Sequence, residues 1–381
     1  MNEQEIFDNA KSLISPLGQF HYRGIDFSIV SGGPTYIPGE FHSGEDGDAS
    51  YHTGILGQAM VFRYLKNPNK IEETAQVIDR LLSYFELFIE HVGHIGRNIV
   101  SKKAYDKFLP QHKNGTASWS PFLPDKSGDH MRYKEVNLNG NTYYFRYDVS
   151  PDQMTGVVNF LYWVVKIIPN SELAIRARNI AKIQLEYYEK NDYLIKDDDG
   201  KLLRYGYHKP ISYFLPVNLM FVSVLKSIIG RSIDLTWYDK IILNLVRTYM
   251  TGIFKSKKTR DQFNNYMITM NLHSLINEGI DLHKGIKRMF KETEGEKNFY
   301  NHAVENHLYK SNKETANENN IVPRNYHSHV YIPTDFVVPF EYRTGYNYWE
   351  ASPYRKTLIK KEVLSGFLGN EDILQAYWLG K

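Results

Sequence analysis

The chain contains no cysteine, which excludes disulfide frameworks and thiolate zinc sites. It also lacks the glycine-rich loop of nucleotide hydrolases, the dinucleotide fingerprint and the Gly-x-Ser-x-Gly elbow of serine hydrolases. The net charge of +3 at pH 7 is too small to indicate a nucleic-acid partner. No run approaches the roughly 20 apolar residues of a membrane span. Residues 1–20 do not have the pattern of a signal peptide, so a cytoplasmic location is expected.

The chain is rich in aromatic residues. They make up 14% of its 381 residues, and 29 of them are tyrosine. Tyrosine offers a flat apolar body with a hydroxyl at its tip, which suits grooves that bind sugars as well as ordinary cores. The length allows one large domain, and we treat residues 1–381 as such a domain.

Apolar residues at helical spacing predict a mainly α-helical fold built from consecutive helix pairs. The predicted helices are 3–13, 50–65, 71–92, 151–168, 171–190, 212–229, 235–254, 262–277 and 283–292. Four other stretches are predicted to differ: 93–147 as a long inserted loop region with a β-hairpin at 132–146, 197–200 as a plain hairpin turn, 294–320 as a charged surface excursion, and 321–381 as an aromatic tail that packs on the domain and ends in a short helix.

The stretch 146–156 is the one around which we organise the chain. Ser150 is expected to cap the following helix, Pro151 fits its first position, and Gln153 completes a capping box. Asp148 and Asp152 then stand at a helix start, beside Arg146 and close to the positive end of the helix dipole.

Two helix pairs are predicted to begin alike. His52-Thr53-Gly54 and Met154-Thr155-Gly156 each place Thr-Gly just inside a helix start, after a turn that bears an acid. Repeated helix pairs entered by polar loops are typical of an α/α toroid, whose inner helix starts line one funnel. Glycine at such a start either lets a ligand approach the backbone or permits tight helix packing, and both interpretations stay open.

The segment 48–97, with Thr53-Gly54 and Gly93-His94-Ile95-Gly96-Arg97, resembles bacterial α/α-toroid proteins of the glycoside hydrolase and polysaccharide lyase type. The turn Asp148-Val149-Ser150-Pro151-Asp152-Gln153 is similar to an Asp-Ser-x-Asp-Gln-like turn of that group. The resemblance covers about a third of the chain. It implies a toroid with small β insertions at the funnel mouth and a cleft related to carbohydrates.

Hydrolysis of a glycosidic bond needs two carboxyl groups, one protonated and one ionised, on opposite sides of the bond. A pair from different funnel loops, such as Asp48 with Asp152 or Asp148, suits a toroid, and we predict these three as the catalytic candidates. Asp46, Asp335 and Glu350 are further carboxylates of the same kind. The residues predicted to bind the poly- or oligosaccharide substrate are His52, Arg97, Arg146, Tyr207, His208, Asp335 and Trp349.

Three alternatives remain at this point. A polysaccharide lyase would use a His or Tyr base and an Arg to neutralise a uronate. A scaffold or glycan-binding protein would keep the aromatic cleft without chemistry. Metal-dependent hydrolysis would use His327, His329 and Asp335, although a lone His-x-His is a weak metal signal. No cofactor is expected.

Overall fold

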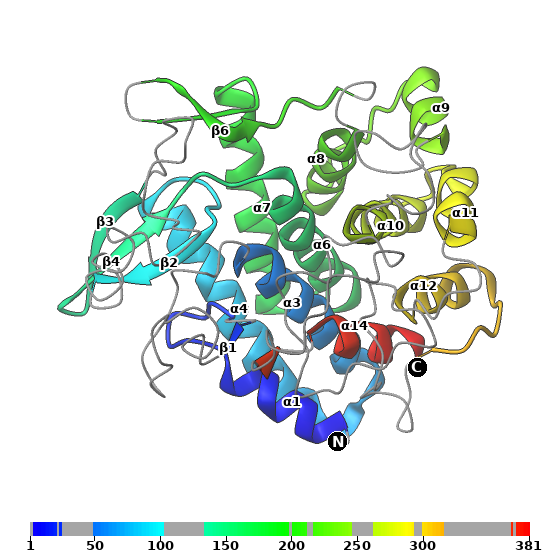
Figure 1. Ribbon diagram of the computed structural model, residues 1–381, viewed down its shortest axis with the longest axis horizontal. Coiled ribbons are helices and arrows are strands. Elements are labelled where there is room, and N and C mark those ends of the chain that lie inside the picture. Colours follow the sequence, from blue (N-terminus) through cyan, green and yellow to red (C-terminus); the bar gives the residue numbers. More distant parts are fainter. Residues whose placement is uncertain are drawn as a thin grey trace, which may run out of the picture.

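The computed structural model describes residues 3–20, 23–24, 49–102, 133–197, 200–211, 216–245, 262–292, 299–315, 367–368 and 371–381. This described part is mainly helical with small sheets, as Figure 1 shows, so the predicted mainly-α class is confirmed. Within it, no helix combines the length and the apolar character that crossing a bilayer demands.

Most helices lie within a few residues of the predicted ranges. The predicted helix 235–254 is described only as far as residue 245. The α-helices are α1 (Glu3–Ser12), α3 (Ala49–Lys66), α4 (Ile71–His91), α6 (Pro151–Ile167), α7 (Glu172–Lys190), α8 (Pro216–Ile228), α9 (Trp237–Leu245), α10 (Gln262–Asn277), α11 (His283–Glu292), α12 (Phe299–Tyr309) and α14 (Glu371–Gly380).

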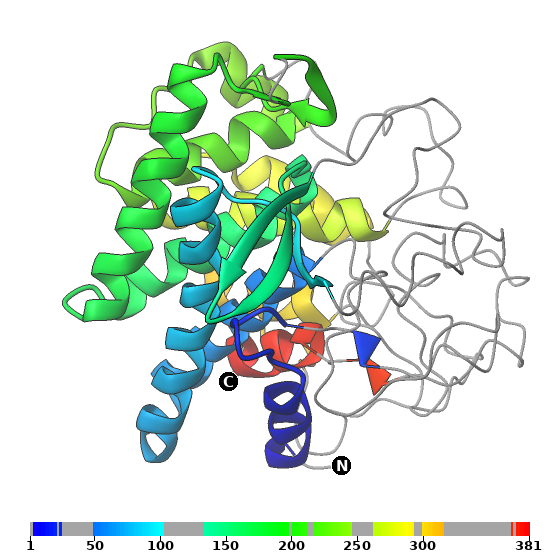
Figure 2. The same cartoon turned by 90° about the vertical axis from the view of Figure 1, so that its left-hand side faces the viewer.

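The strands form small antiparallel sheets. Strand β4 (Asn141–Arg146) lies between β2 (Asn98–Ser101) and β3 (Tyr133–Leu138). Asn139 and Gly140 connect β3 to β4 with positive φ angles of 49° and 78°, as a tight hairpin turn requires. The other pairs are β5 (Leu194–Lys196) with β6 (Leu202–Tyr207), and β1 (Arg23–Gly24) with β7 (Phe367–Leu368). Both predicted hairpins are confirmed. Figure 2 looks onto the β2–β4–β3 sheet, which lies in front of the central helices.

Helices α3 and α6 are the centre of the fold, because residues 49–63 of α3 are all buried and α6 is nearly so. They run parallel. Gly54 meets Gly156 and, one turn later, Gly57 meets Phe160. A Cβ added at Gly54 would lie 2.4 Å from the carbonyl carbon of Gly156, and one at Gly156 would lie 2.5 Å from the carbonyl oxygen of Tyr51. Of the two interpretations of these glycines, the structure therefore supports tight helix packing.

Substituting Gly54 with alanine tests this contact. In a solvated helix the change gains about 0.5–1 kcal/mol of stability. Here we expect the free energy of unfolding to fall by about 1–3 kcal/mol, because the added methyl group separates the two central helices. Urea unfolding of Gly54→Ala measures this, with Gln76→Ala at an exposed position of α4 as the control. An unchanged or raised stability would contradict the packing role.

Contacts between helices close a circuit around this centre. Helix α3 contacts α6, α6 contacts α8, α8 contacts α10, α10 contacts α12, α12 contacts α14, and α14 returns to α3. Helices α4, α7, α9, α11 and α1 each pack against members of this circuit or against one another. Figure 1 shows α1 and α14 side by side, so the two ends of the described chain meet.

Buried amides fill the middle of the circuit. The Gln58 amide nitrogen lies 3.3 Å from the carbonyl oxygen of Gly156 and 3.6 Å from the sulfur of Met270. Its amide oxygen accepts a hydrogen bond of 2.8 Å from Gln375 on α14. Side chains from α3, α6, α10 and α14 thus converge on one point. Since unsatisfied buried amides are costly, this network fixes how the four helices meet.

A second polar ladder joins α6 to α10. Asn159 donates to Asn271 at 2.9 Å and accepts from Ser274 at 2.5 Å, while Asn271 donates to Thr155 at 3.1 Å. Residue numbers rise together along both helices, so α6 and α10 are also parallel. The threonine of the second Thr-Gly pair, Thr155, therefore has a hydrogen-bond partner within the core.

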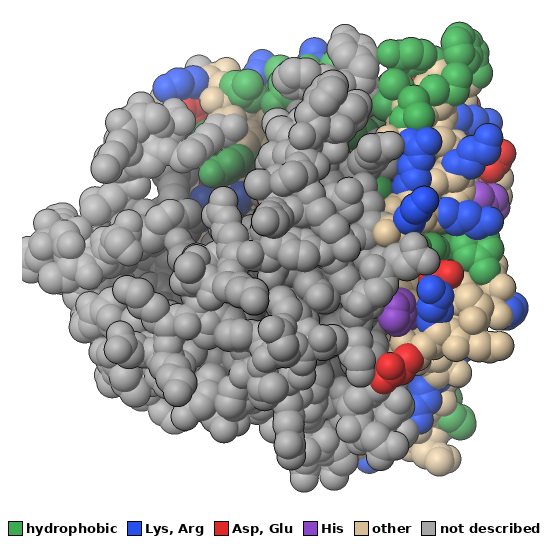
Figure 3. All heavy atoms as spheres, turned by 45° about the vertical axis from the view of Figure 1, so that its right-hand side comes forward, with side chains coloured by type: hydrophobic (Ala, Val, Ile, Leu, Met, Phe, Trp, Pro, Cys, Tyr) green, Lys and Arg blue, Asp and Glu red, His purple; other side chains and the backbone are tan. Residues whose placement is uncertain are grey.

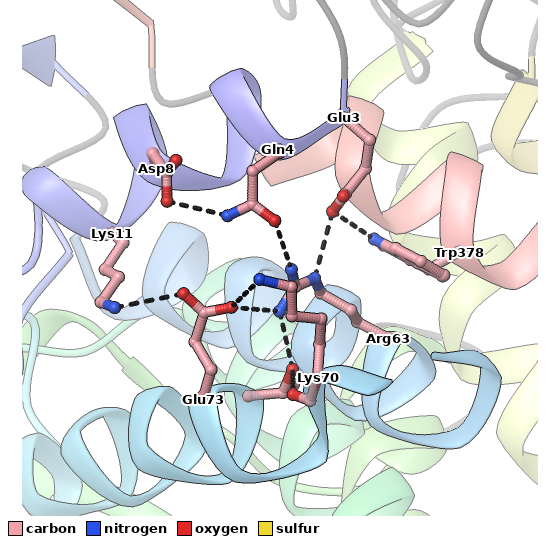
Figure 4. A network of polar contacts seen from close by, with 9 residues as sticks. Glu3, Gln4, Asp8, Lys11, Arg63, Lys70, Glu73 and Trp378 are labelled. Carbon is pink, nitrogen blue, oxygen red and sulfur yellow. Dashed lines mark hydrogen bonds and ion pairs between the residues drawn. The ribbon is translucent and has the colours of Figure 1, made fainter. Parts of the chain in front are cut away.

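Arg63 links the two chain ends to the centre, as Figure 4 shows. Its side chain is fully buried, and it donates to Glu3 at 3.1 Å, to Gln4 at 3.3 Å and to Thr74 at 2.8 Å. The guanidinium lies 3.7 Å from the ring centroid of Phe7, and Trp378 donates to the same Glu3 oxygen at 3.2 Å. One cation thus holds α1, α3, α4 and α14 together.

The prediction of a surface excursion over 294–320 is wrong for its middle. Helix α12 occupies residues 299–309 and buries Tyr300, Ala303 and Val304 against neighbouring helices. Asn, His and Glu dilute the apolar positions of this helix, which hid its period. The short helix expected at the end of the tail is confirmed as α14, which packs directly on α3.

Candidate functional site

The parallel packing of α3 and α6 brings two helix starts together with the sheet that precedes α6. Arg97 lies immediately before β2, Arg146 ends β4, and Asp148 and Ser150 form the turn into α6. We call these four residues the helix-start cluster. All four are buried.

An ion pair forms the core of the helix-start cluster. The Arg146 Nε and Nη2 donate to the two carboxylate oxygens of Asp148 at 2.6 and 2.8 Å. Arg97 donates from Nε to the Asp148 carbonyl oxygen at 3.0 Å and from Nη2 to Ser150 Oγ at 2.7 Å. The Tyr205 ring centroid lies 4.9 Å from the Arg97 guanidinium carbon. These charge-assisted hydrogen bonds fix the turn before α6.

The backbone of Arg97 ties the same place to α3 and α4. Its amide donates to the Arg146 carbonyl at 2.7 Å. Its own carbonyl oxygen accepts from the amide and hydroxyl of Ser50 at 3.1 and 3.0 Å and from the Tyr84 hydroxyl at 3.1 Å. The segment Gly93-His94-Ile95-Gly96-Arg97 therefore ends in a hydrogen-bonded junction between the sheet and the first helix pair.

The predicted capping box at α6 is wrong, although the helix begins where it was predicted. Ser150 occupies the N-cap position, but its side chain makes no capping hydrogen bond and instead accepts from Arg97. Gln153 is buried in the first turn. An arginine distant in sequence thus takes the hydroxyl that local spacing assigns to the helix.

Two predicted residues lie next to the helix-start cluster without belonging to it. Asp152 is half-buried in the first turn of α6, where the positive end of the helix dipole favours a carboxylate. His52 is buried in the first turn of α3, and its ring stacks edge-on against Tyr51 at 5.1 Å between centroids. Asp152 is the more exposed of the two predicted catalytic carboxylates that the structure describes.

Tyr207 and His208 lie at the end of β6. Tyr207 is half-buried. His208 is fully buried, with Nδ1 2.6 Å from the Tyr188 hydroxyl and Nε2 3.0 Å from the Tyr205 carbonyl oxygen. Burial lowers the pKa of His208 to about 3, and burial likewise lowers the pKa of His94 to about 4. These low pKa values leave both rings neutral at pH 7, and the hydrogen bonds of His208 join the end of β6 to Tyr188 on α7.

These depressed pKa values predict a loss of stability in mild acid. The unfolded chain binds a proton on each histidine below about pH 6.5, whereas the folded chain does not until about pH 4 for His94 and about pH 3 for His208. The contribution of these two histidines to the free energy of unfolding is therefore fully present above about pH 6.5, and it is lost as the pH falls below that value. Each histidine contributes a slope of about 1.4 kcal/mol per pH unit.

Urea unfolding between pH 7 and pH 5 measures this slope. In the variant His208→Asn we expect a shallower pH dependence, whatever its stability at pH 7. His273, also buried with a lowered pKa, keeps its own contribution in that variant. A pH dependence equal to that of the unchanged protein would show that His208 is not buried in its neutral form.

Several predicted site residues lie outside the described residues. They are Asp46, Asp48, His327, His329, Asp335, Trp349 and Glu350. Among the described residues, no group of three His, Asp or Glu side chains is placed to hold a metal ion. Sequence reasoning missed Ser50, Tyr84 and Tyr188, which hold Arg97 and His208, because each contact joins different elements, over 13 to 47 residues of sequence.

The chain was compared with protein-family models, with curated proteins and with solved structures, and no match was found.

Proposed function

We propose that the helices form an α/α toroid and that the chain cleaves glycosidic bonds of a poly- or oligosaccharide at the start of its central helices. The closed circuit of contacts, the parallel course of α3, α6 and α10, and the buried amides around Gln58 support the toroid. In this architecture the inner helix starts share one end of the molecule, where loops can surround a substrate.

One observation carries the site: the starts of α3 and α6 lie side by side and are locked together by the helix-start cluster. We assign Asp152 as one of the two carboxyl groups that hydrolysis needs. Asp48, which directly precedes α3 in the sequence, is the proposed second group. We assign the Asp148 carboxylate to holding the turn, because both of its oxygens already accept hydrogen bonds from Arg146.

An assay on a panel of neutral and uronate-containing polysaccharides tests the proposal. New reducing ends without absorbance at about 235 nm are expected, since hydrolysis creates no double bond whereas β-elimination does. Absorbance together with new ends would replace hydrolysis by a lyase reaction with His52 or Tyr207 as base. Saturable binding of a polysaccharide without turnover would indicate the scaffold alternative instead.

A further inference from the structure

Helix α9 carries a row of apolar side chains that faces outward. Trp237 is 75% exposed, Leu245 47%, Tyr238 45% and Ile241 44%. Positions 237, 241 and 245 follow one another at four-residue spacing, and 238 lies beside them, so the four side chains form one stripe. We call these four residues the α9 stripe. A largely exposed tryptophan next to exposed Ile and Leu is unusual unless the surface binds something.

The contacts of the opposite face of α9 orient the α9 stripe toward the outside of the molecule. Leu243 is fully buried on the opposite face of α9. Asn244 donates to the Asp281 carbonyl oxygen at 3.1 Å and accepts from the Gly285 amide at 2.9 Å. At the start of the helix, Thr236 and Asp239 exchange hydrogen bonds as a capping box, which engages the Asp239 carboxylate. The exposed row is therefore the free face of a helix that is fixed on α11.

Basic side chains lie next to the α9 stripe. Figure 3 shows Lys and Arg side chains directly below a group of hydrophobic ones, on the side where Figure 1 places α9 and α11. Neither Lys240 on α9 nor Lys284 or Lys291 on α11 forms an ion pair with a carboxylate of the described residues. Arg288 and Lys287 add two further positive charges to α11. The exposed carboxylates in this part of the chain include Asp234 and Asp281.

We propose that the α9 stripe and the adjoining cations of α11 bind the surface of a lipid bilayer that contains anionic headgroups. Trp and Tyr at one end, Ile and Leu along the same face, and lysines beside them form the pattern of a helix that lies in a membrane interface. A second copy of the chain would bring like charges of α11 together, which disfavours self-association. A sugar polymer would use Trp237 and Tyr238 but leaves Ile241 and Leu245 without a role. This inference is independent of the proposed glycosidic activity.

Vesicle flotation of the full chain tests the proposal, with vesicles of phosphatidylcholine alone and of phosphatidylcholine mixed with phosphatidylglycerol. One variant removes apolar contacts (Trp237→Ser with Ile241→Ser) and another reverses charge (Lys284→Glu with Lys291→Glu). The controls are Ile175→Ser and Lys182→Glu, whose side chains are also exposed and lie on α7, a helix that packs mainly on α4, α6 and α8.

The unchanged chain is expected to float with the anionic vesicles only, and less so as salt is added. Each double variant should lower the partition coefficient at least about tenfold. The charge reversals remove two cations that contribute about fivefold each, and the serine substitutions remove apolar side chains that would enter the interface. The two controls should bind as the unchanged chain does. Absence of flotation would overturn the proposal. Heparin binding that is equally strong in the unchanged chain and in the Trp237 variant would also overturn it, because it would indicate a site for polyanions. So would a dimer of the unchanged chain in sedimentation that is monomeric in the Trp237 variant.

Discussion

Replacing Arg63 with methionine is expected to lower the free energy of unfolding by about 3–5 kcal/mol, the usual cost of removing one partner from a buried ion pair. The side chain is fully buried and its guanidinium bonds to groups from α1 and α4. Methionine fills much of the volume but leaves Glu3 and Glu73 without their shared cation. The urea unfolding midpoint gives the change.

Two further substitutions make the Arg63 result specific. Arg231→Met removes an exposed ion pair with Glu189 and should cost no more than about 1 kcal/mol. Arg63→Lys keeps the positive charge but loses the planar guanidinium with its several donors. Its free energy of unfolding should therefore lie between those of Arg63→Met and the unchanged protein. Equal, small losses for Arg63→Met and Arg231→Met would show that Arg63 does not hold the chain ends to the centre.

Asp148→Asn is the second substitution with a large expected effect. It removes the negative charge that neutralises the buried Arg146, and we expect a loss of about 3–5 kcal/mol in the free energy of unfolding. Asp192→Asn, which breaks an exposed pair with Lys209, should change it by at most about 1 kcal/mol.

The double variant Arg146→Met with Asp148→Leu separates charge from packing. Replacing both ions with apolar groups removes the uncompensated charge, so we expect it to be more stable than Asp148→Asn alone. If the double variant were the less stable of the two, the hydrogen bonds of the helix-start cluster, and not charge balance, would set the stability of the turn before α6.

The sequence predicted the helix pairs well because their signals are local. The apolar period of α4, proline at the start of α6, and Ser171, which does cap α7, lie within a few residues of the ends that they determine. The hairpin at Asn139 and Gly140 was found for the same reason. Helix α12 was missed because its polar residues obscure the period, although tertiary packing buries it.

The candidate site was predicted in part. The stretch 146–156 does join the sheet to α6, a helix that is buried over nearly its whole length, and Asp148 and Arg146 do lie together. Local spacing does not predict that the Ser150 hydroxyl accepts a hydrogen bond from Arg97 instead of capping α6, or that Gly54 packs on Gly156. These contacts depend on how segments some 50 to 100 residues apart meet in space, and no pattern within one segment encodes that meeting.

The most direct test of the central claim compares Asp152→Asn with the unchanged chain on the polysaccharide that the panel identifies. We predict that the rate of new reducing ends falls by at least about a hundredfold, as loss of a general acid or base does. The free energy of unfolding should fall by no more than about 1 kcal/mol, the contribution of a carboxylate at a helix start. Full activity in Asp152→Asn would contradict the assignment of the catalytic site to the start of α6.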